Sequence, residues 1–200
     1  MPTALDRSRL HVEGSDDKHT VIQLLIRHGV PYDQEPWPEE LPVIENIGGV
    51  DALLAGVETA VMTSTGRAIG FVADANFPLR SRWQAVRDRL RRVGVDAPDS
   101  PPICGYVGTS ARYRSRIGVW LMPDNQQDGS LESFIQTLVG ETDPLIAHAS
   151  AATDTALTLG ATFGLPSRLK AVTHTWLAWQ EEPGAPMERP SRHGTWAMIA

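Results

Sequence analysis

The chain has 200 residues, of which 42% are hydrophobic and 21% charged, with 17 glycines and 15 prolines. This length and balance predict a globular protein with a core of its own, and they exclude disordered, collagen-like and fibrous classes. The single cysteine, Cys104, excludes an internal disulfide, and the absence of a CxxC or Cys/His cluster excludes a zinc site. The 18 basic and 24 acidic side chains give a net charge of −6, which argues at first against a protein that coats nucleic acid.

The N-terminal residues 1–10 are polar and contain no apolar leader segment. No stretch of the sequence approaches the roughly 18 apolar residues that span a bilayer. Together with the single cysteine, these features predict a cytoplasmic protein with no membrane among its partners.

Strand and helix patterns alternate along the chain. The opening unit is typical: Arg9–Val12 alternates as a strand does, Ser15 is a suitable N-cap, and apolar residues then recur at helical spacing up to Gly29. In chain order, we predict strands at 9–12, 42–47, 68–73, 103–107 and 117–122, helices at 15–29, 50–62, 81–93, 131–139, 145–159 and 167–179, and an irregular tail at 182–194.

Strands that alternate with helices imply βαβ units with right-handed crossovers. The predicted fold class is therefore α/β and Rossmann-like, with a mostly parallel central sheet, helices on both faces and a C-terminal helical extension. We predict one domain over residues 1–200, with a core at about 8–140 and C-terminal helices and tail at about 141–200.

Three predicted strands are followed by a carboxylate: Glu13, Asp74 and Asp124. In open α/β sheets the ligand crevice lies at the carboxyl ends of the strands, so we expect these three acids to converge on one site. Each acid taken alone is better explained as a cap of the turn or helix that follows it, but the three together favour the site.

Clustered carboxylates without cysteine or a histidine pair favour a hard cation, Mg²⁺ or Mn²⁺, which prefers oxygen ligands. Asp17 lies four residues after Glu13, and Asn76 lies two after Asp74, so both are further candidate ligands. Asp17 also suits the positive end of a helix dipole, and Asn76 also suits a turn.

Several other chemistries are excluded by missing residues. Asn76 cannot protonate a leaving group, which excludes a haloacid-dehalogenase-type phosphatase. No G-x-x-x-x-G-K-[ST] loop and no G-x-S-x-G elbow are present, which argues against a kinase, an ATPase or a serine hydrolase. Cys104 lies in an apolar stretch and is expected to be buried, and His11 is expected to be a packed strand residue.

Taken together, Val12–Asp17, Val72–Asn76 and Met122–Asn125 resemble the motifs of a Toprim domain, the metal-binding module of topoisomerases, primases and overcoming-lysogenization-defect nucleases. More closely, the chain resembles a family of small standalone Toprim-like proteins over about residues 8–185. The further segments that carry this resemblance are Gly48–Asp51, Arg82-Trp83, Gly118–Asn125, Gly129–Glu132 and Lys170 with His174–Gln180.

The resemblance implies a Rossmann-like Toprim fold and a Mg²⁺ or Mn²⁺ site. It implies that Glu13 is a metal ligand or general base, and that Lys170 contacts phosphate as a catalytic residue. The remaining residues that it places on or around the metal are Asp17, Asp74, Asn76, Asp124 and Glu132. Two departures are expected: Asn76 stands where the family has an acid, which weakens binding of two metals, and the family's last helix is absent or different here.

The charge is unevenly distributed along the chain. Residues 1–60 carry −7 and residues 121–200 carry −5, whereas residues 61–120, with 10 basic and 4 acidic side chains, carry +6. Arginine suits bidentate contacts to phosphate, although a solvated helix face explains the same pattern. The predicted nucleic-acid-binding residues are Arg80, Arg82, Arg87, Arg91, Arg112, Arg114 and Arg116.

Two functions follow from these observations. The first is a Mg²⁺- or Mn²⁺-dependent phosphodiester-cleaving enzyme that acts on nucleic acid. The alternative is a Toprim-like subunit that is inactive alone and works with a separate ATPase in defence or repair. A third interpretation, in which the acids only cap helices, stays open. The partners to be expected are nucleic acid, an ATPase subunit and a second copy of the chain.

Overall fold

The computed structural model describes residues 7–140 and 142–180. The chain divides into two compact units, Met1–Ser130 and Leu131–Ala200. The division falls between residues 130 and 131, and the helix predicted at 131–139 packs against a helix of the second unit. The tail predicted at 182–194 and the expected change at the last family helix lie outside the described residues.

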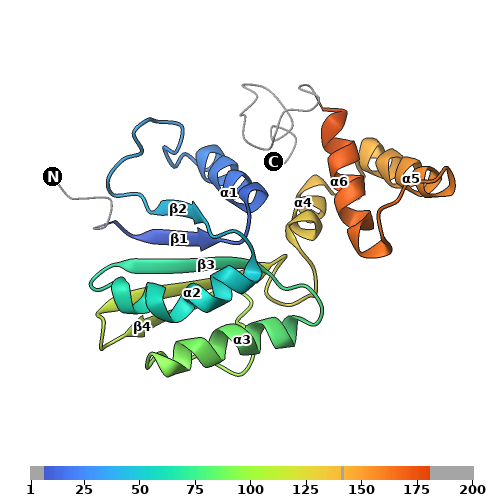
Figure 1. Ribbon diagram of the computed structural model, residues 1–200. Coiled ribbons are helices and arrows are strands. Elements are labelled where there is room, and N and C mark those ends of the chain that lie inside the picture. Colours follow the sequence, from blue (N-terminus) through green and yellow to red (C-terminus); the bar gives the residue numbers. More distant parts are fainter. Residues whose placement is uncertain (1–6, 141, 181–200) are drawn as a thin grey trace. The chain divides into compact units, whose positions relative to one another are not determined.

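The first unit is built on a five-stranded sheet in the order β2-β1-β3-β5-β4. Only β4 runs antiparallel to its neighbour, β5, and the other pairs are parallel. Its elements are β1 (Arg9–Val12), α1 (Ser15–Arg27), β2 (Val43–Asn46), α2 (Val50–Thr63), β3 (Ala68–Asp74), α3 (Leu79–Arg92), β4 (Tyr106–Ser110) and β5 (Ser115–Met122). The predicted α/β class with a mostly parallel sheet is confirmed (Figure 1).

Helices cover both faces of the sheet, as predicted. Phe71 of β3 and Val119 of β5 pair in register and face α2 and α3, where they form the main hydrophobic core. Because side chains alternate across a strand, Leu10 and Gly70 face the other way, toward the side where α1 packs against β1 and β2. A Cβ on Gly70 would lie 2.6 Å from Cδ1 of Leu10, so the leucine side chain occupies the space beside this glycine.

The strand predicted at 103–107 begins three residues later, at Tyr106. Gly105 precedes it with a φ of +79° and packs against the ring of Trp120, so the chain bends before the strand starts. Ile103 is consequently 67% exposed, and Cys104 is exposed too. The expectation that Cys104 is buried was wrong, because an apolar stretch was assigned to the sheet when it belongs to the loop.

The described part of the second unit is helical. It contains α4 (Leu131–Val139), α5 (Pro144–Thr158), a 3-10 turn η2 (Leu165–Ser167) and α6 (Arg168–Ala178), which confirms the predicted C-terminal helical extension. Asp143 caps α5 by accepting the N–H groups of Leu145 and Ile146 at 2.7 and 3.1 Å. α6 packs against both α5 and α4. Over the described residues, every helix falls short of the length and apolar character needed to cross a membrane.

Candidate functional site

Glu13 and Asp74 lie together at the carboxyl ends of two adjacent parallel strands. Val12 of β1 pairs in register with Val72 of β3, so the residues that follow leave the sheet side by side. Oε2 of Glu13 accepts the main-chain N–H of Asp74 at 3.1 Å. The contact joins the Glu13 carboxylate to the main chain of Asp74, so convergence of the carboxylates of Glu13, Asp74 and Asp124 stays a prediction. We call this place, Glu13 with Asp74, the acidic edge.

Asp17 is held beside the acidic edge by a local hydrogen bond. Its Oδ2 accepts the N–H of Gly14 at 3.0 Å, and the residue is buried. Gly14, not Ser15, is the N-cap of α1, so the predicted cap was one residue late. This contact fixes the turn that carries Glu13 out of β1 and into the helix, and it gives Asp17 the structural role that the capping interpretation allowed.

Asn76 ties the loop after β3 to the loop after β5. Its backbone is left-handed, with a φ of 54°, and its N–H donates to the carbonyl of Gly129 at 2.7 Å, while that of Gly129 donates back at 3.2 Å. Close by, Oδ1 of Asp128 accepts the N–H of Leu79, the first residue of α3, at 2.6 Å. Asn76 is thus a turn residue, as its residue type allows, and the turn lies two residues after Asp74 of the acidic edge. Asp128 was not singled out from the sequence.

Asp124 turns its carboxylate onto its own loop. Oδ1 accepts the N–H groups of Gln126 and Gln127, both at 2.9 Å, and Oδ2 accepts from Nε2 of Gln127 at 2.8 Å. Burial raises the pKa of Asp124, but the hydrogen bonds from Gln126 and Gln127 outweigh this and hold the pKa below its ordinary value. The next residue, Asn125, is buried and accepts the N–H of Leu121 at 2.7 Å. These contacts order the loop after β5.

Arg82 is the arginine that the structure places at the acidic edge. It lies in the first turn of α3, and its Nε donates to the carbonyl oxygen of Asp74 at 3.0 Å. Asp74 therefore lies between a carboxylate oxygen of Glu13 on its N–H and a guanidinium on its C=O. An anionic ligand that approaches this edge would meet a positive charge beside the acids.

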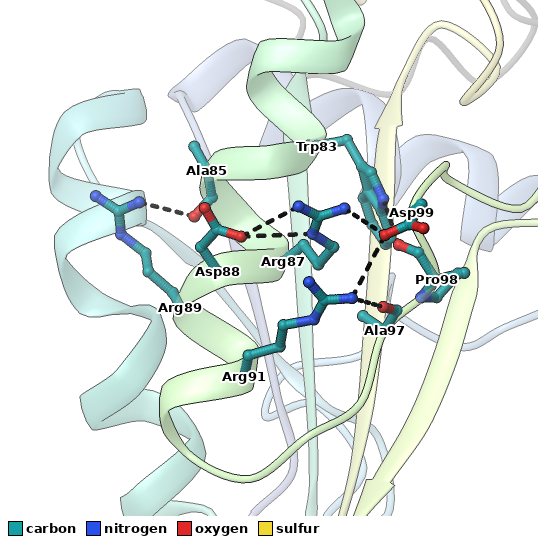
Figure 2. Close-up of polar contacts among 9 residues, drawn as sticks. All are labelled: Trp83, Ala85, Arg87, Asp88, Arg89, Arg91, Ala97, Pro98 and Asp99. Carbon is teal, nitrogen blue, oxygen red and sulfur yellow. Dashed lines mark hydrogen bonds and ion pairs between the residues drawn. The ribbon is translucent and has the colours of Figure 1, made fainter.

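The arginines in the middle of α3 are paired within the fold, as Figure 2 shows. Arg87 contacts Asp99 at 2.8 Å and Asp88 at 3.4 Å. Arg91 contacts the same Asp99 at 3.5 Å and the carbonyl of Ala97 at 3.2 Å. Along the same helix, Trp83 donates to the carbonyl of Pro98 at 3.0 Å. Arg87 and Arg91, two of the predicted nucleic-acid-binding arginines, thus hold the loop at residues 97–99 against α3.

The other predicted nucleic-acid-binding arginines are exposed. Arg80 lies at the start of α3, and Arg112, Arg114 and Arg116 lie on the hairpin that joins β4 to β5. The guanidinium of Arg112 lies 5.3 Å from the ring centroid of Tyr113. The predicted nucleic-acid-binding arginines therefore do not form one continuous surface. Arg80, Arg112, Arg114 and Arg116 face solvent, whereas Arg87 and Arg91 form intramolecular pairs.

Glu132 and Lys170, which the resemblance assigned to the site, form an ion pair within the helical unit. Nζ of Lys170 lies 3.4 Å from Oε1 of Glu132 and joins α6 to α4. The glutamate side chain is 12% exposed and the lysine 57%. The pair satisfies a largely buried carboxylate, which is a structural role for both residues.

Glu13 and Asp74 are the candidate cation ligands at the acidic edge. Over residues 7–140 and 142–180, no group of three or more His, Cys, Asp or Glu is arranged to hold a metal ion. Mg²⁺ is commonly held by one or two carboxylates together with substrate phosphate and water. A site of that kind at Glu13 and Asp74 stays a prediction.

A family model described as "Protein of unknown function (DUF3226)" matches residues 7–197 of the chain. No curated protein and no solved structure matches. The match spans the sheet unit and the helical unit, and it names no activity, so the Toprim resemblance stays a prediction.

Proposed function

Because the chain belongs to the DUF3226 family, whose description gives no function, we propose an activity from the acidic edge: Mg²⁺- or Mn²⁺-dependent cleavage of phosphodiester bonds in nucleic acid. The observation that carries this proposal is the hydrogen bond from the Asp74 N–H to the Glu13 carboxylate, which fixes two acids at the carboxyl ends of adjacent parallel strands. Ligands of open α/β sheets bind at that edge. The resemblance of the same residues to Toprim motifs supports the same activity.

In this proposal Glu13 is a ligand of the cation and is already oriented for that task. The bond to Asp74 uses one carboxylate oxygen, and a carboxylate has two, so Glu13 can be held in position and still offer an oxygen. A bound Mg²⁺ or Mn²⁺ supplies Lewis-acid stabilisation of charge on the phosphoryl group. Arg82, anchored on Asp74, would hold a phosphate oxygen and align the substrate.

The activity is tested by incubating the pure chain with plasmid DNA and with a single-stranded oligonucleotide in Mn²⁺. We expect cleavage by the wild type and by Glu40→Gln, an exposed acid outside the site, and no cleavage by Glu13→Gln or Asp74→Asn. Calorimetry with Mn²⁺ alone and with oligonucleotide measures cation binding by the same proteins. Cleavage that persists in both site variants would overturn the proposal.

A second candidate is a Toprim-like subunit that needs a separate ATPase. The observation that favours it is the small acid set: Asn76 stands at the third position of the Asp74 motif, and the structure uses it as a turn residue. This function predicts that the chain alone binds no Mn²⁺, with or without oligonucleotide, and forms a stable complex with a purified ATPase. Cleavage by the chain alone would exclude it.

A further inference from the structure

A groove of about 460 Å³ lies within the first unit, beside helix α2. α2 packs against β3 and α3, and the groove runs between this helix and the neighbouring face of β1 and β2. Its floor includes Arg9 and His11 of β1 and Glu45 of β2, and its wall includes Gly56 and Thr63 of α2. A volume of this size is typical of a site for a small organic molecule.

The groove starts at the opposite end of the strands from the acidic edge and runs along them as far as His11 and Ile47. Arg9 and Ala68, which line the groove, begin β1 and β3, whereas Glu13 and Asp74 lie where these strands end. A strand advances about 3.3 Å per residue, so the four residues from Arg9 to Glu13 cover about 13 Å. Neither Glu13 nor Asp74 is part of the groove lining, so the groove is a second place for a ligand.

The charged residues that line the groove are mainly basic. Arg7, Arg9 and Arg67 contribute three positive charges, and Glu45 contributes one negative charge. The carboxylate of Glu45 is compensated by Arg9: Oε1 lies 2.5 Å from Nη1 of Arg9. Its other oxygen, Oε2, lies 3.2 Å from Nε2 of His11. The groove is thus positive within a chain whose net charge is −6.

The guanidinium groups of Arg7 and Arg67 donate to main-chain carbonyls. A carbonyl carries no formal charge, so these contacts do not neutralise the positive charge of either arginine. Nη2 of Arg7 donates to the carbonyls of Pro38 and Leu41, both at 2.6 Å. Nη2 of Arg67 donates to the carbonyl of Thr63 at 2.6 Å. Arg7 also donates from Nε to Leu41 at 3.2 Å and from Nη1 to the carbonyl of Trp37 at 3.5 Å, so little of its donor capacity remains. A guanidinium has five N–H donors, so Arg67, held by Thr63, is the arginine that can still donate to an oxyanion.

The rest of the groove is largely apolar. Ile47, Ala60 and Ile69 contribute to its lining. Gly56 adds open space, because a Cβ built on it has no neighbour within 4 Å. A ligand of this groove must therefore combine a negatively charged group, for the arginines at the rim, with an apolar body for the interior.

We propose that this groove binds a small amphipathic anion, an aromatic or aliphatic body that bears an oxyanion group. The oxyanion contacts the arginines at the groove, and the body packs between β1, β2 and α2. This binding does not depend on the activity proposed for the acidic edge.

The test uses the fluorescent probe 1-anilinonaphthalene-8-sulfonate and its uncharged counterpart N-phenyl-1-naphthylamine. Three variants accompany the wild type. Gly56→Leu fills the groove from the wall, and Ala55→Leu adds the same side chain at the neighbouring exposed position outside the lining. Arg67→Gln removes a positive charge from the rim and leaves the interior unchanged. Thermal unfolding of each protein establishes that it is folded.

We expect the wild type to bind the sulfonate at one saturable site and the uncharged probe at least tenfold more weakly. Ala55→Leu should bind the sulfonate as the wild type does, Gly56→Leu at least tenfold more weakly, and Arg67→Gln several-fold more weakly. Equal binding of the two probes, or wild-type sulfonate binding by both Gly56→Leu and Arg67→Gln, would overturn the proposal. Glu13→Gln should keep full sulfonate binding, which separates this result from any loss of nuclease activity.

Discussion

The acidic edge and helix α3 are both rich in charge, but the fold uses their charges differently. At the acidic edge, acids far apart in sequence meet because two parallel strands end together, and Glu13 accepts only a main-chain N–H from Asp74 in that contact. On α3, Arg87 and Arg91 are neighbours on one helix face and share the carboxylate of Asp99. A dense charge pattern on one helix can therefore be used within the fold, as it is on α3.

The largest expected effect separates the two regions by activity. Asp74→Asn keeps the size of the side chain and removes its charge, and we expect it to lower the rate of DNA cleavage in Mn²⁺ by about 100-fold or more, the scale on which loss of a catalytic group acts. Asp99→Asn makes the same chemical change on the α3 side and should leave the rate unchanged. If Asp74→Asn and Asp99→Asn lowered the cleavage rate equally, the acidic edge would have no special role in the reaction.

The next effect concerns the strand packing that aligns the acidic edge. Gly70→Val would place a Cβ 2.6 Å from Leu10, so we expect unfolding in urea to cost about 1–3 kcal/mol less than in the wild type. Leu10→Ala in the same protein should restore part of the stability by vacating the space. Equal stability of Gly70→Val and the wild type would mean that the Leu10 side chain moves aside without cost.

Two arginines of α3 give a sharper comparison, because both lie on one helix. Arg82→Gln removes the guanidinium on Asp74, and we expect KM for oligonucleotide to rise by about tenfold, the loss of one charge-assisted contact. Arg87→Gln should leave KM within about twofold, since Arg87 is paired with Asp88 and Asp99. A rise in KM for Arg87→Gln as large as that for Arg82→Gln would show that both arginines contact the nucleic acid.

The sequence predicted the parts of this structure that depend on repeated patterns. Alternating strands and helices indicated the sheet, and acids after Val12 and Ala73 indicated the acidic edge, because backbone geometry alone brings such positions together. It did not predict the orientation of Asp124, which is decided by hydrogen bonds within its own loop. Nor did it predict the partners of Arg87, because the position of Asp99 depends on how a proline-containing loop folds back on α3.

A smaller effect is expected on the pH dependence of stability. It arises from His11, which lies in β1 two residues before Glu13. Burial lowers the pKa of His11, Glu45 opposes that shift, and Arg9 adds to it. The unfolded chain therefore protonates first as pH falls through about 6.5, so stability should decrease there and level off below the folded pKa. In urea unfolding at pH 7.5 and 5.5, His11→Gln should lose less stability than the wild type. The same loss in both proteins would contradict this role.

The smallest effect is expected where the sequence is most highly charged. Asp99 is 89% exposed although two arginines share it, and an exposed ion pair gains little because water screens it and both side chains lose freedom. Asp99→Asn should therefore reduce the free energy of unfolding by less than about 1 kcal/mol, and 0.5 M NaCl should reduce the difference further. Arg87 keeps Asp88 in that variant, whereas Trp83 keeps its bond to Pro98, so the loop at residues 97–99 stays attached. A loss several times larger, insensitive to salt, would show that the α3 arginines stabilise the fold as strongly as buried core residues do, and would leave the exposed arginines alone to contact a phosphate backbone.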